Sequence, residues 1–193
     1  MHTCSNRSHR CLFDAFGIAM NPADFHFKTQ LDDGMTVTIR PIRPDDAIIE
    51  QEFVRSLSPQ SKFLRFFAPL KELSPAALKK FTQTNYPSDM ALIATITEQD
   101  VEREIGVARY APGTRDGWVE FAVAVADEWQ GKGIATQLLR NLFNIAKEAG
   151  IRGIEGSILR ENRQMLILAK ELGFVARSNH EDTSVTYVHK DLQ

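Results

Sequence analysis

The chain of 193 residues is long enough for one domain with a hydrophobic core of its own. Its formal net charge of −2 argues against a general nucleic-acid binder and against electrostatic attachment to a membrane surface. Charged residues make up 25% and hydrophobic residues 43% of the sequence, and no apolar run approaches the roughly 20 residues of a membrane span. We therefore expect a soluble cytoplasmic protein with neither a nucleic-acid nor a membrane partner.

The beginning of the chain differs from the rest. Residues 1–30 predict an N-terminal extension, poorly ordered, and residues 31–193 predict the folded domain. Both cysteines lie in the extension, so the domain has neither a disulfide nor a cysteine nucleophile unless the N-terminus folds back. A metal site is the alternative for the side chains gathered there; we favour incidental residues and expect no metal. These side chains are His2, Cys4, His9 and Cys11.

The helices of the first half begin at recognisable caps. Residues 35–43 alternate and predict a strand, and a helix is expected over about 44–56. Ser58-Pro59 and Ser74-Pro75 each predict a further helix start, because serine caps the first turn and proline suits the first helical position. We expect the phenylalanines of these helices to belong to the core; they include Phe63, Phe66 and Phe67.

An antiparallel meander is expected next. Residues 90–97 and 104–110 predict two strands, separated by a polar turn over 98–103. The strand that follows alternates strictly from Val119. Its bulky face predicts contact with the core, whereas alanines leave room beside Glu120 on the other face and favour a cleft. The bulky face consists of Val119, Phe121, Val123 and Val125, and the other of Glu120, Ala122, Ala124 and Ala126.

A glycine-rich turn, Gln130-Gly131-Lys132-Gly133-Ile134-Ala135, then opens directly into an amphipathic helix that Gly150 ends. The first amides of a helix lack internal partners and carry the positive end of its dipole. Without a Cβ, glycine lets a ligand approach the backbone, so the turn predicts an anion site, most naturally for phosphate. The alternative is an ordinary strand-to-helix turn; neither the NTPase phosphate loop nor the dinucleotide fingerprint matches.

The last third predicts a βαβ unit and a closing hairpin. A strand is expected over 153–159, a helix over 162–172, and strands over 174–176 and 184–188. Together with the earlier elements this order predicts an α+β fold. Its mixed, mostly antiparallel sheet is flanked by helices in a three-layer α/β arrangement.

The turn matches the Q/R-x-x-G-x-G/A motif of the GNAT superfamily of acyl-CoA-dependent N-acetyltransferases. The strand before it, the helix after it and the later Glu161-Asn162 and Leu172-Gly173-Phe174 stretches keep the family's order. The chain therefore resembles this superfamily from about Thr36 to its C-terminus. The resemblance implies the GNAT fold, with acetyl-CoA as co-substrate and its pyrophosphate on the amides of the turn.

The resemblance also implies individual roles. Backbone groups of Val123, Ala124 and Val125 would pair with the pantetheine arm of coenzyme A. Lys132 would add charge near a phosphate or remain a solvated lysine, and Asn162 would reach the cofactor, cap the last helix, or both. The residues of the turn that would hold the pyrophosphate are Gln130, Gly131, Lys132, Gly133, Ile134 and Ala135.

Glu120 occupies the position of the family's catalytic glutamate. An amine attacks a thioester only as the free base, so a base must remove a proton directly or through water. The alternative for Glu120 is an ion pair with Arg109 or a lysine at a strand edge. Where many relatives carry a tyrosine acid, this sequence has Ala169, so a tyrosine acid there is excluded. Without a cysteine in the domain, we expect direct attack in a ternary complex.

Three segments, residues 38–43, 58–67 and 120–123, look like the bacterial protein-lysine acetyltransferases of this superfamily. This resemblance implies acetyl transfer to a reactive lysine of a protein partner, such as an acyl-CoA synthetase. Two alternatives stay open: acetylation of a small amine, and a non-catalytic coenzyme-A-binding sensor on the same fold.

Overall fold

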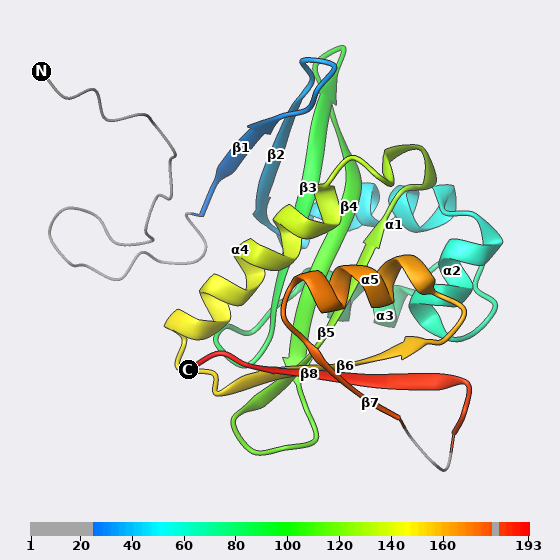
Figure 1. Cartoon of the computed structure of the whole chain (residues 1–193). Helices are drawn as coiled ribbons and strands as arrows, with labels where there is room; N and C mark the ends of the chain where they lie inside the picture. Colours follow the sequence, from blue (N-terminus) through cyan, green and yellow to red (C-terminus); the bar gives the residue numbers. More distant parts are fainter. Residues whose placement is uncertain (1–24, 179–181) are drawn as a thin grey trace, which may run out of the picture.

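A computed structural model describes residues 25–178 and 182–193 (Figure 1). An eight-stranded sheet with the order β1-β2-β3-β4-β5-β6-β8-β7 runs through this part of the chain. Every described strand pair is antiparallel except β5–β6. The strands are β1 (Phe27–Gln30), β2 (Thr36–Pro41), β3 (Met90–Glu98), β4 (Val101–Pro112), β5 (Trp118–Val125), β6 (Gly153–Leu159), β7 (Val175–Ser178) and β8 (Val185–Asp191).

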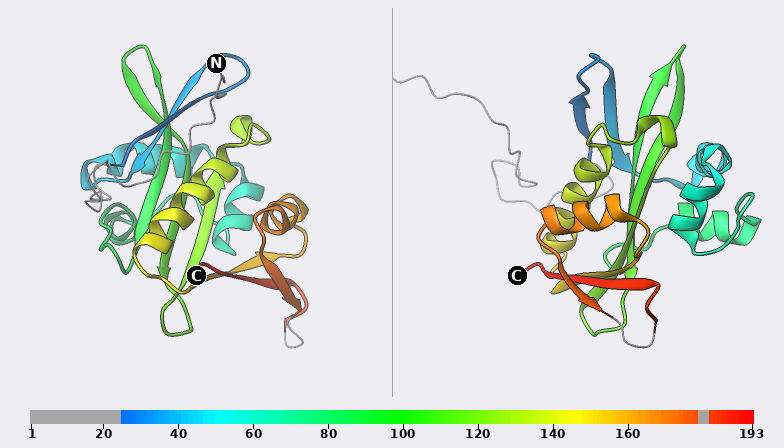
Figure 2. Two further views of the ribbon diagram at one scale, coloured as in Figure 1. Left: turned by 60° about the vertical axis from the view of Figure 1, so that its left-hand side comes forward. Right: turned by 45° about the vertical axis from the view of Figure 1, so that its right-hand side comes forward.

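Helices cover both faces of the sheet, which confirms the predicted α+β architecture. In the right-hand view of Figure 2, α4 and α5 lie on one face and α1, α2 and α3 on the other. The apolar face of α4 supplies Leu138, Leu139 and Leu142 to the core, all fully buried. The helices are α1 (Ala47–Ser56), α2 (Pro59–Phe66), α3 (Pro75–Thr82), α4 (Ile134–Glu148) and α5 (Arg163–Glu171), with short 3-10 turns at Pro44–Asp46 and Asp127–Trp129.

The predicted serine caps are present. Ser58 Oγ accepts a hydrogen bond from the Ser61 amide (3.1 Å), and Ser74 Oγ accepts one from the Ala77 amide (3.2 Å). The placement of the phenylalanines on α2 was wrong in part: Phe63 and Phe67 are exposed by 38% and 43%. The reason is that α2 is a short helix at the margin of its layer, so it has only one face to bury.

The loop between β3 and β4 is much shorter than predicted. Only Gln99 and Asp100 turn the chain, and Glu98 already pairs with Val101. Both turn residues have positive φ (51° and 63°), as a two-residue hairpin turn of the I′ kind requires. Glycine or asparagine usually signals such a turn, so the polar sequence around Gln99 gave no sign of its tightness.

The sheet also begins earlier than the predicted domain boundary at residue 31. Strand β1 pairs with β2, with Phe27 opposite Ile39, and Phe25 just before it is buried. Residues 25–30 therefore belong to the folded unit. The predicted disorder of the leader, and its cysteines, lie outside the described residues.

Strands β5 and β6 run side by side only briefly. Their parallel pairing covers Trp118 with Gly153, Val119 with Ile154, and Glu120 with Glu155. Beyond these pairs the strands separate, and β6 continues in register with β8. Figure 1 shows β6 and β8 crossing the direction of β5 at this point. Within residues 25–178 and 182–193, the split leaves the β6-facing main chain of β5 beyond Glu120 without a strand partner, and Glu120 lies at the point where the strands separate.

Candidate active site

A cavity of about 490 Å³, here called the donor cavity, lies where β5 and β6 separate. Of the residues predicted to bind coenzyme A, all but Lys132 line it. Its walls come from β5, from the turn before α4, from the first turn of α4, and from α2 and α5. The lining includes Ser61, Leu64, Arg65, Val123, Ala124, Val125, Trp129, Gln130, Gly131, Gly133, Ile134, Ala135, Asn162 and Met165.

The turn at the start of α4 has the geometry of an anion site. Gly131 and Gly133 have φ of +76° and +80°, values that residues with a Cβ rarely adopt. Gly133 is the N-cap of α4, so the first amides of a 15-residue helix face the cavity without intrahelical acceptors. The helix dipole adds positive potential at the same place. Main-chain geometry alone therefore favours phosphate here.

The side chains of this turn are used to hold it in place. Lys132 Nζ pairs with Asp33 Oδ2 in the β1–β2 connection (3.3 Å) and lies 4.7 Å from the centre of the Trp129 ring. Gln130 Nε2 donates to the Val125 carbonyl (3.1 Å) and to Ser61 Oγ (3.3 Å). The amides of the turn thus remain the groups best placed for a ligand.

Of the two roles considered for Asn162 in the sequence, the structure shows the helix cap, and the contact with the cofactor stays a prediction. Its Oδ1 accepts a hydrogen bond from the Met165 amide (3.1 Å) and so caps α5. The same residue lines the donor cavity.

A second cavity of about 370 Å³, here called the acceptor cavity, contains Glu120. It shares Leu64, Arg65, Val123 and Met165 with the donor cavity, so the two meet side by side. The remaining wall is mostly aromatic and aliphatic, and consists of Phe66, Phe67, Arg109, Ala111, Phe121, Ala122, Ser157 and Ile158.

The carboxylate of Glu120 is exposed to this cavity and makes no ion pair among the described residues. The alternative of a pair with Arg109 was wrong. Arg109 Nη2 instead lies 3.8 Å from Glu50 Oε1 and donates to the Phe81 carbonyl (3.0 Å). Its guanidinium also lies 4.0 Å from the centre of the Phe81 ring. Glu120 is therefore free to meet an incoming group.

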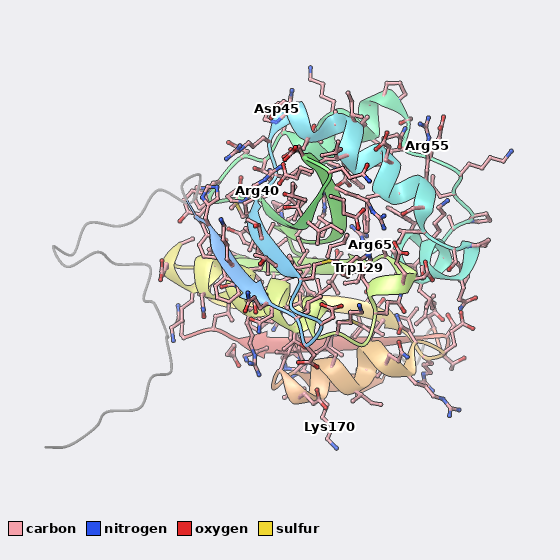
Figure 3. All side chains as sticks on the ribbon, turned by 90° about the horizontal axis from the view of Figure 1, so that it is seen from above. Arg40, Asp45, Arg55, Arg65, Trp129 and Lys170 are labelled. Carbon is pink, nitrogen blue, oxygen red and sulfur yellow. The ribbon has the colours of Figure 1, made fainter. Side chains whose placement is uncertain are left out.

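Arg65 and Arg109 are functional candidates that the sequence reading missed. Burial, together with the charge of Arg109, lowers the pKa of the Arg65 guanidinium to about 10, although Glu50 and Glu120 act in the opposite direction. Arg65 and Trp129 both line the donor cavity, whereas Figure 3 shows Lys170 projecting outward from α5. The only signal in the sequence was that Arg65 lies within residues 58–67, which resemble the protein-lysine acetyltransferases. This resemblance does not tell where the side chain of Arg65 points.

Helix α2 is held over the cavities by Asp127. The Asp127 carboxylate accepts hydrogen bonds from the Ser58 amide (2.9 Å), Ser58 Oγ (2.7 Å) and Ser61 Oγ (2.8 Å). Burial opposes ionisation, but these hydrogen bonds outweigh it and hold the pKa of Asp127 below its usual value. The loop that carries the anion site thus also fixes the helix that carries Arg65.

Ala169 is buried and lines neither cavity, and none of the three tyrosines of the chain does so. Within residues 25–178 and 182–193, no cluster of histidine, cysteine, aspartate and glutamate could hold a metal ion. No helix of the same ranges is long and apolar enough to cross a bilayer.

Comparison with known proteins identifies the family of the chain. The family model for the acetyltransferase (GNAT) domain matches residues 36–175. Acetyltransferase PA5475 of Pseudomonas aeruginosa is 37% identical over 165 residues, which cover 86% of this chain and 88% of its own.

Two solved structures illustrate the likeness. The crystal structure of the GNAT domain of S. lividans PAT has a TM-score of 0.78 at 30% identity, covering 89% of this chain and 99% of that one. The structure of yncA from Salmonella typhimurium with its cofactor acetyl-CoA has the same fold, with a TM-score of 0.63 at 20% identity over 81% of this chain and 94% of that one. The chain belongs to the GNAT acetyltransferase family and is an acyltransferase of the kind that uses acetyl-CoA.

Proposed function

We propose that the protein transfers the acetyl group of acetyl-CoA to the side-chain amine of a lysine on a protein partner. The observation that carries this proposal is the meeting of two cavities at the split between β5 and β6. One cavity offers an anion site and a free strand edge, and the other offers the unpaired carboxylate of Glu120.

The donor cavity suits coenzyme A. Its volume lies within the range of about 300 to 1,000 Å³ that is usual for small-molecule sites. The pyrophosphate would rest on the amides at the start of α4, and the pantetheine amides would pair with the free edge of β5 at residues 123–125. The apolar lining from α5 suits the rest of the arm. The thioester would then end at the junction of the two cavities.

The reaction at this junction requires a base. We assign this role to Glu120, which takes a proton from the lysine ammonium, directly or through water, so that the free amine can attack. The nitrogen forms a bond to the thioester carbon, the carbon–sulfur bond then breaks, and the electron pair leaves on sulfur as a thiolate. The second proton, which the nitrogen carries after the attack, passes to this thiolate or to water, so that the amide is neutral. A thiol ionises near pH 8.5, so the thiolate leaves without the tyrosine acid that Ala169 replaces.

The acceptor cavity favours lysine over a polyamine or another polycation. Its wall provides apolar surface for the four-carbon stem of a lysine. Among the described residues that line it, Glu120 is the only carboxylate, so the cavity has no acidic cluster that would bind a polycation. The exposed Phe67 at this cavity offers the kind of aromatic surface that protein partners cover.

Release of free thiol from acetyl-CoA tests this function. The purified protein would be incubated with a lysate and, separately, with a panel of small amines, and labelled lysines would be identified by mass spectrometry. Release driven by protein, with label on lysine, is the expected result. If only a small amine drives thiol release, the substrate is that amine and not a protein lysine. If the protein binds coenzyme A but releases no thiol with any acceptor, the result favours a non-catalytic sensor.

A further inference from the structure

Arg65 differs from Arg40 and Arg109 in having no polar partner among the described residues. No hydrogen bond or ion pair in the described part of the chain involves its side chain, which lies 5.0 Å from the Phe66 ring centre. By contrast, the buried Arg40 donates to Asp46 (2.7 Å) and Glu102 (2.8 Å), and Arg109 is held by the Phe81 carbonyl. The side chain of Arg65 is only partly buried, so its unpaired donors remain available to a molecule bound in the cavities that it lines.

The position of Arg65 indicates what binds it. Arg65 lines both the donor and the acceptor cavity, as one of the four residues that they share. In the proposed function this junction is where the thioester carbonyl meets the attacking amine. The charges of Glu50 and Glu120 favour the cationic form of Arg65, so the guanidinium is positive at neutral pH.

We propose that Arg65 is a further catalytic residue, whose guanidinium stabilises the negative charge that develops on the acetyl oxygen during attack. As the nitrogen–carbon bond forms, the carbonyl π electrons move to oxygen and create an oxyanion. When the carbon–sulfur bond breaks, the same electrons re-form the carbonyl. The ammonium proton goes to Glu120 before the attack and the second proton of the nitrogen goes to the leaving thiolate or to water, so Arg65 gives and receives no proton. A fixed donor in such a site contributes far more than it would in water.

Recognition of an acidic group on the acceptor is the competing role for Arg65. The position of Arg65 in the walls of both cavities argues against this role. A residue that recognises only the acceptor would lie in the acceptor cavity alone, as Arg109 does. Arg109 also cannot substitute for Arg65, since Glu50 and Phe81 hold it elsewhere. The two roles differ in kinetics: loss of oxyanion stabilisation lowers kcat, whereas loss of acceptor binding raises KM.

The test compares Arg65→Met and Arg65→Lys with the wild type, using acetyl-CoA and a lysine peptide amide without acidic residues. We expect Arg65→Met to lower kcat by about 10²- to 10³-fold, as loss of one oxyanion donor does, with acetyl-CoA affinity little changed. The Arg65→Lys variant should recover part of the rate, and added guanidinium should rescue an Arg65→Ala variant where sodium at equal ionic strength does not. Arg55→Met is the matched control, because Arg55 is exposed and pairs with Glu72 at the surface.

This inference rests on the proposed function, and the outcomes separate the two. An Arg65→Met protein with wild-type kcat overturns the inference and leaves the function intact. A rise in KM confined to acidic peptides, with kcat unchanged, overturns it in favour of acceptor recognition. A wild-type protein that binds acetyl-CoA but transfers nothing overturns the function and the inference with it. The same loss of kcat without guanidinium or lysine rescue assigns Arg65 a structural role instead.

Discussion

The donor cavity is lined largely by one continuous stretch, from Val123 in β5 to Thr136 in α4, and its chemistry lies in main-chain amides. The acceptor cavity gathers side chains from α2, β4, β5 and β6, which are far apart in the sequence. Beneath the donor cavity the apolar face of α4 is fully buried. Arg109 in the wall of the acceptor cavity belongs to a group of charges whose hydrogen bonds are incomplete, and this group continues to Glu50 and Glu104. The donor half of the site therefore depends on main-chain amides that the fold holds in place. The acceptor half depends on charged side chains that are packed against one another.

Because of this contrast, we expect substitutions in the two halves to change different properties of the protein. Substitutions in the donor half should change acetyl-CoA binding, and substitutions in the acceptor half should change turnover or the pH dependence of stability. Four changes separate these effects, beginning with the change that should have the largest consequence.

Replacement of Glu120 by Gln should lower acetyl transfer by about 10²-fold or more, because the amide cannot accept the amine proton. Acetyl-CoA affinity should stay at the wild-type value, since Glu120 lines only the acceptor cavity. Thiol release measures turnover, and isothermal titration calorimetry measures affinity. Glu171→Gln, an exposed change on α5, is the control and should leave both unaffected. Unchanged turnover in Glu120→Gln would remove Glu120 from the mechanism.

Sequence reasoning was most successful where the chemistry is local. The alternation from Val119 to Ala126, the glycines at 131 and 133, and the serine caps are patterns within a few residues, and they predicted β5, α4 and the helix starts. The positions of the β3–β4 turn and of β1 were missed because neither carries its usual signal. Arg65 was missed for another reason. Its direction depends on how α2 is fixed by Asp127, a contact between residues far apart in sequence.

The next largest effect is expected at the start of α4. Gly133→Val should weaken acetyl-CoA binding by about 10- to 100-fold, or roughly 1.4 to 2.8 kcal/mol, by distorting the turn whose amides face the donor cavity. Calorimetry with coenzyme A measures this loss. Gly150→Val is a matched control at the other end of the helix, with φ of +77° against +80° and equal open space around the added Cβ.

Both glycine variants should lose stability by about 1 to 2 kcal/mol, because a side chain is strained at positive φ. Only Gly133→Val should also lose affinity. Equal affinities for the two variants would mean that the anion does not bind at this turn.

A smaller effect is expected at Asn162, where capping and ligand contact can be separated. Asn162→Ala removes the cap on the Met165 amide and should lower stability by about 1 kcal/mol, together with a severalfold rise in the KM for acetyl-CoA. Asn162→Ser restores a capping oxygen but not the amide group. If Asn162 touches acetyl-CoA, the serine variant should recover stability and keep the raised KM; recovery of both would make Asn162 a cap alone.

The smallest and most indirect effect concerns the buried carboxyls near the acceptor cavity. Glu104 is almost fully buried, and neither of its oxygens has a hydrogen-bond donor in the described part of the chain. Burial and the neighbouring Glu50 raise the pKa of Glu104 well above its usual value. Burial also raises the pKa of Glu50, against the pull of Arg109. A proton kept between the two carboxyls supplies the missing donor and avoids two adjacent charges.

The raised pKa of Glu104 fixes the sign of the pH dependence. In the unfolded chain Glu104 loses its proton near pH 4.5, whereas in the folded protein it keeps the proton to higher pH. The unfolded state is therefore favoured increasingly as pH rises from 4.5 towards the folded pKa. Glu104→Gln removes this pH-dependent destabilisation, so the variant should gain about 1 to 3 kcal/mol relative to wild type in alkaline buffer and little near pH 4.5.

Urea unfolding at several pH values measures this difference, with Glu171→Gln, an exposed change on α5, as the control. A Glu104→Gln variant whose relative stability fell as pH rose would mean that Glu104 is ionised in the folded protein. In that case its charge would be neutralised by Arg109, and the acceptor half would be a balanced ion network instead of a protonated pair.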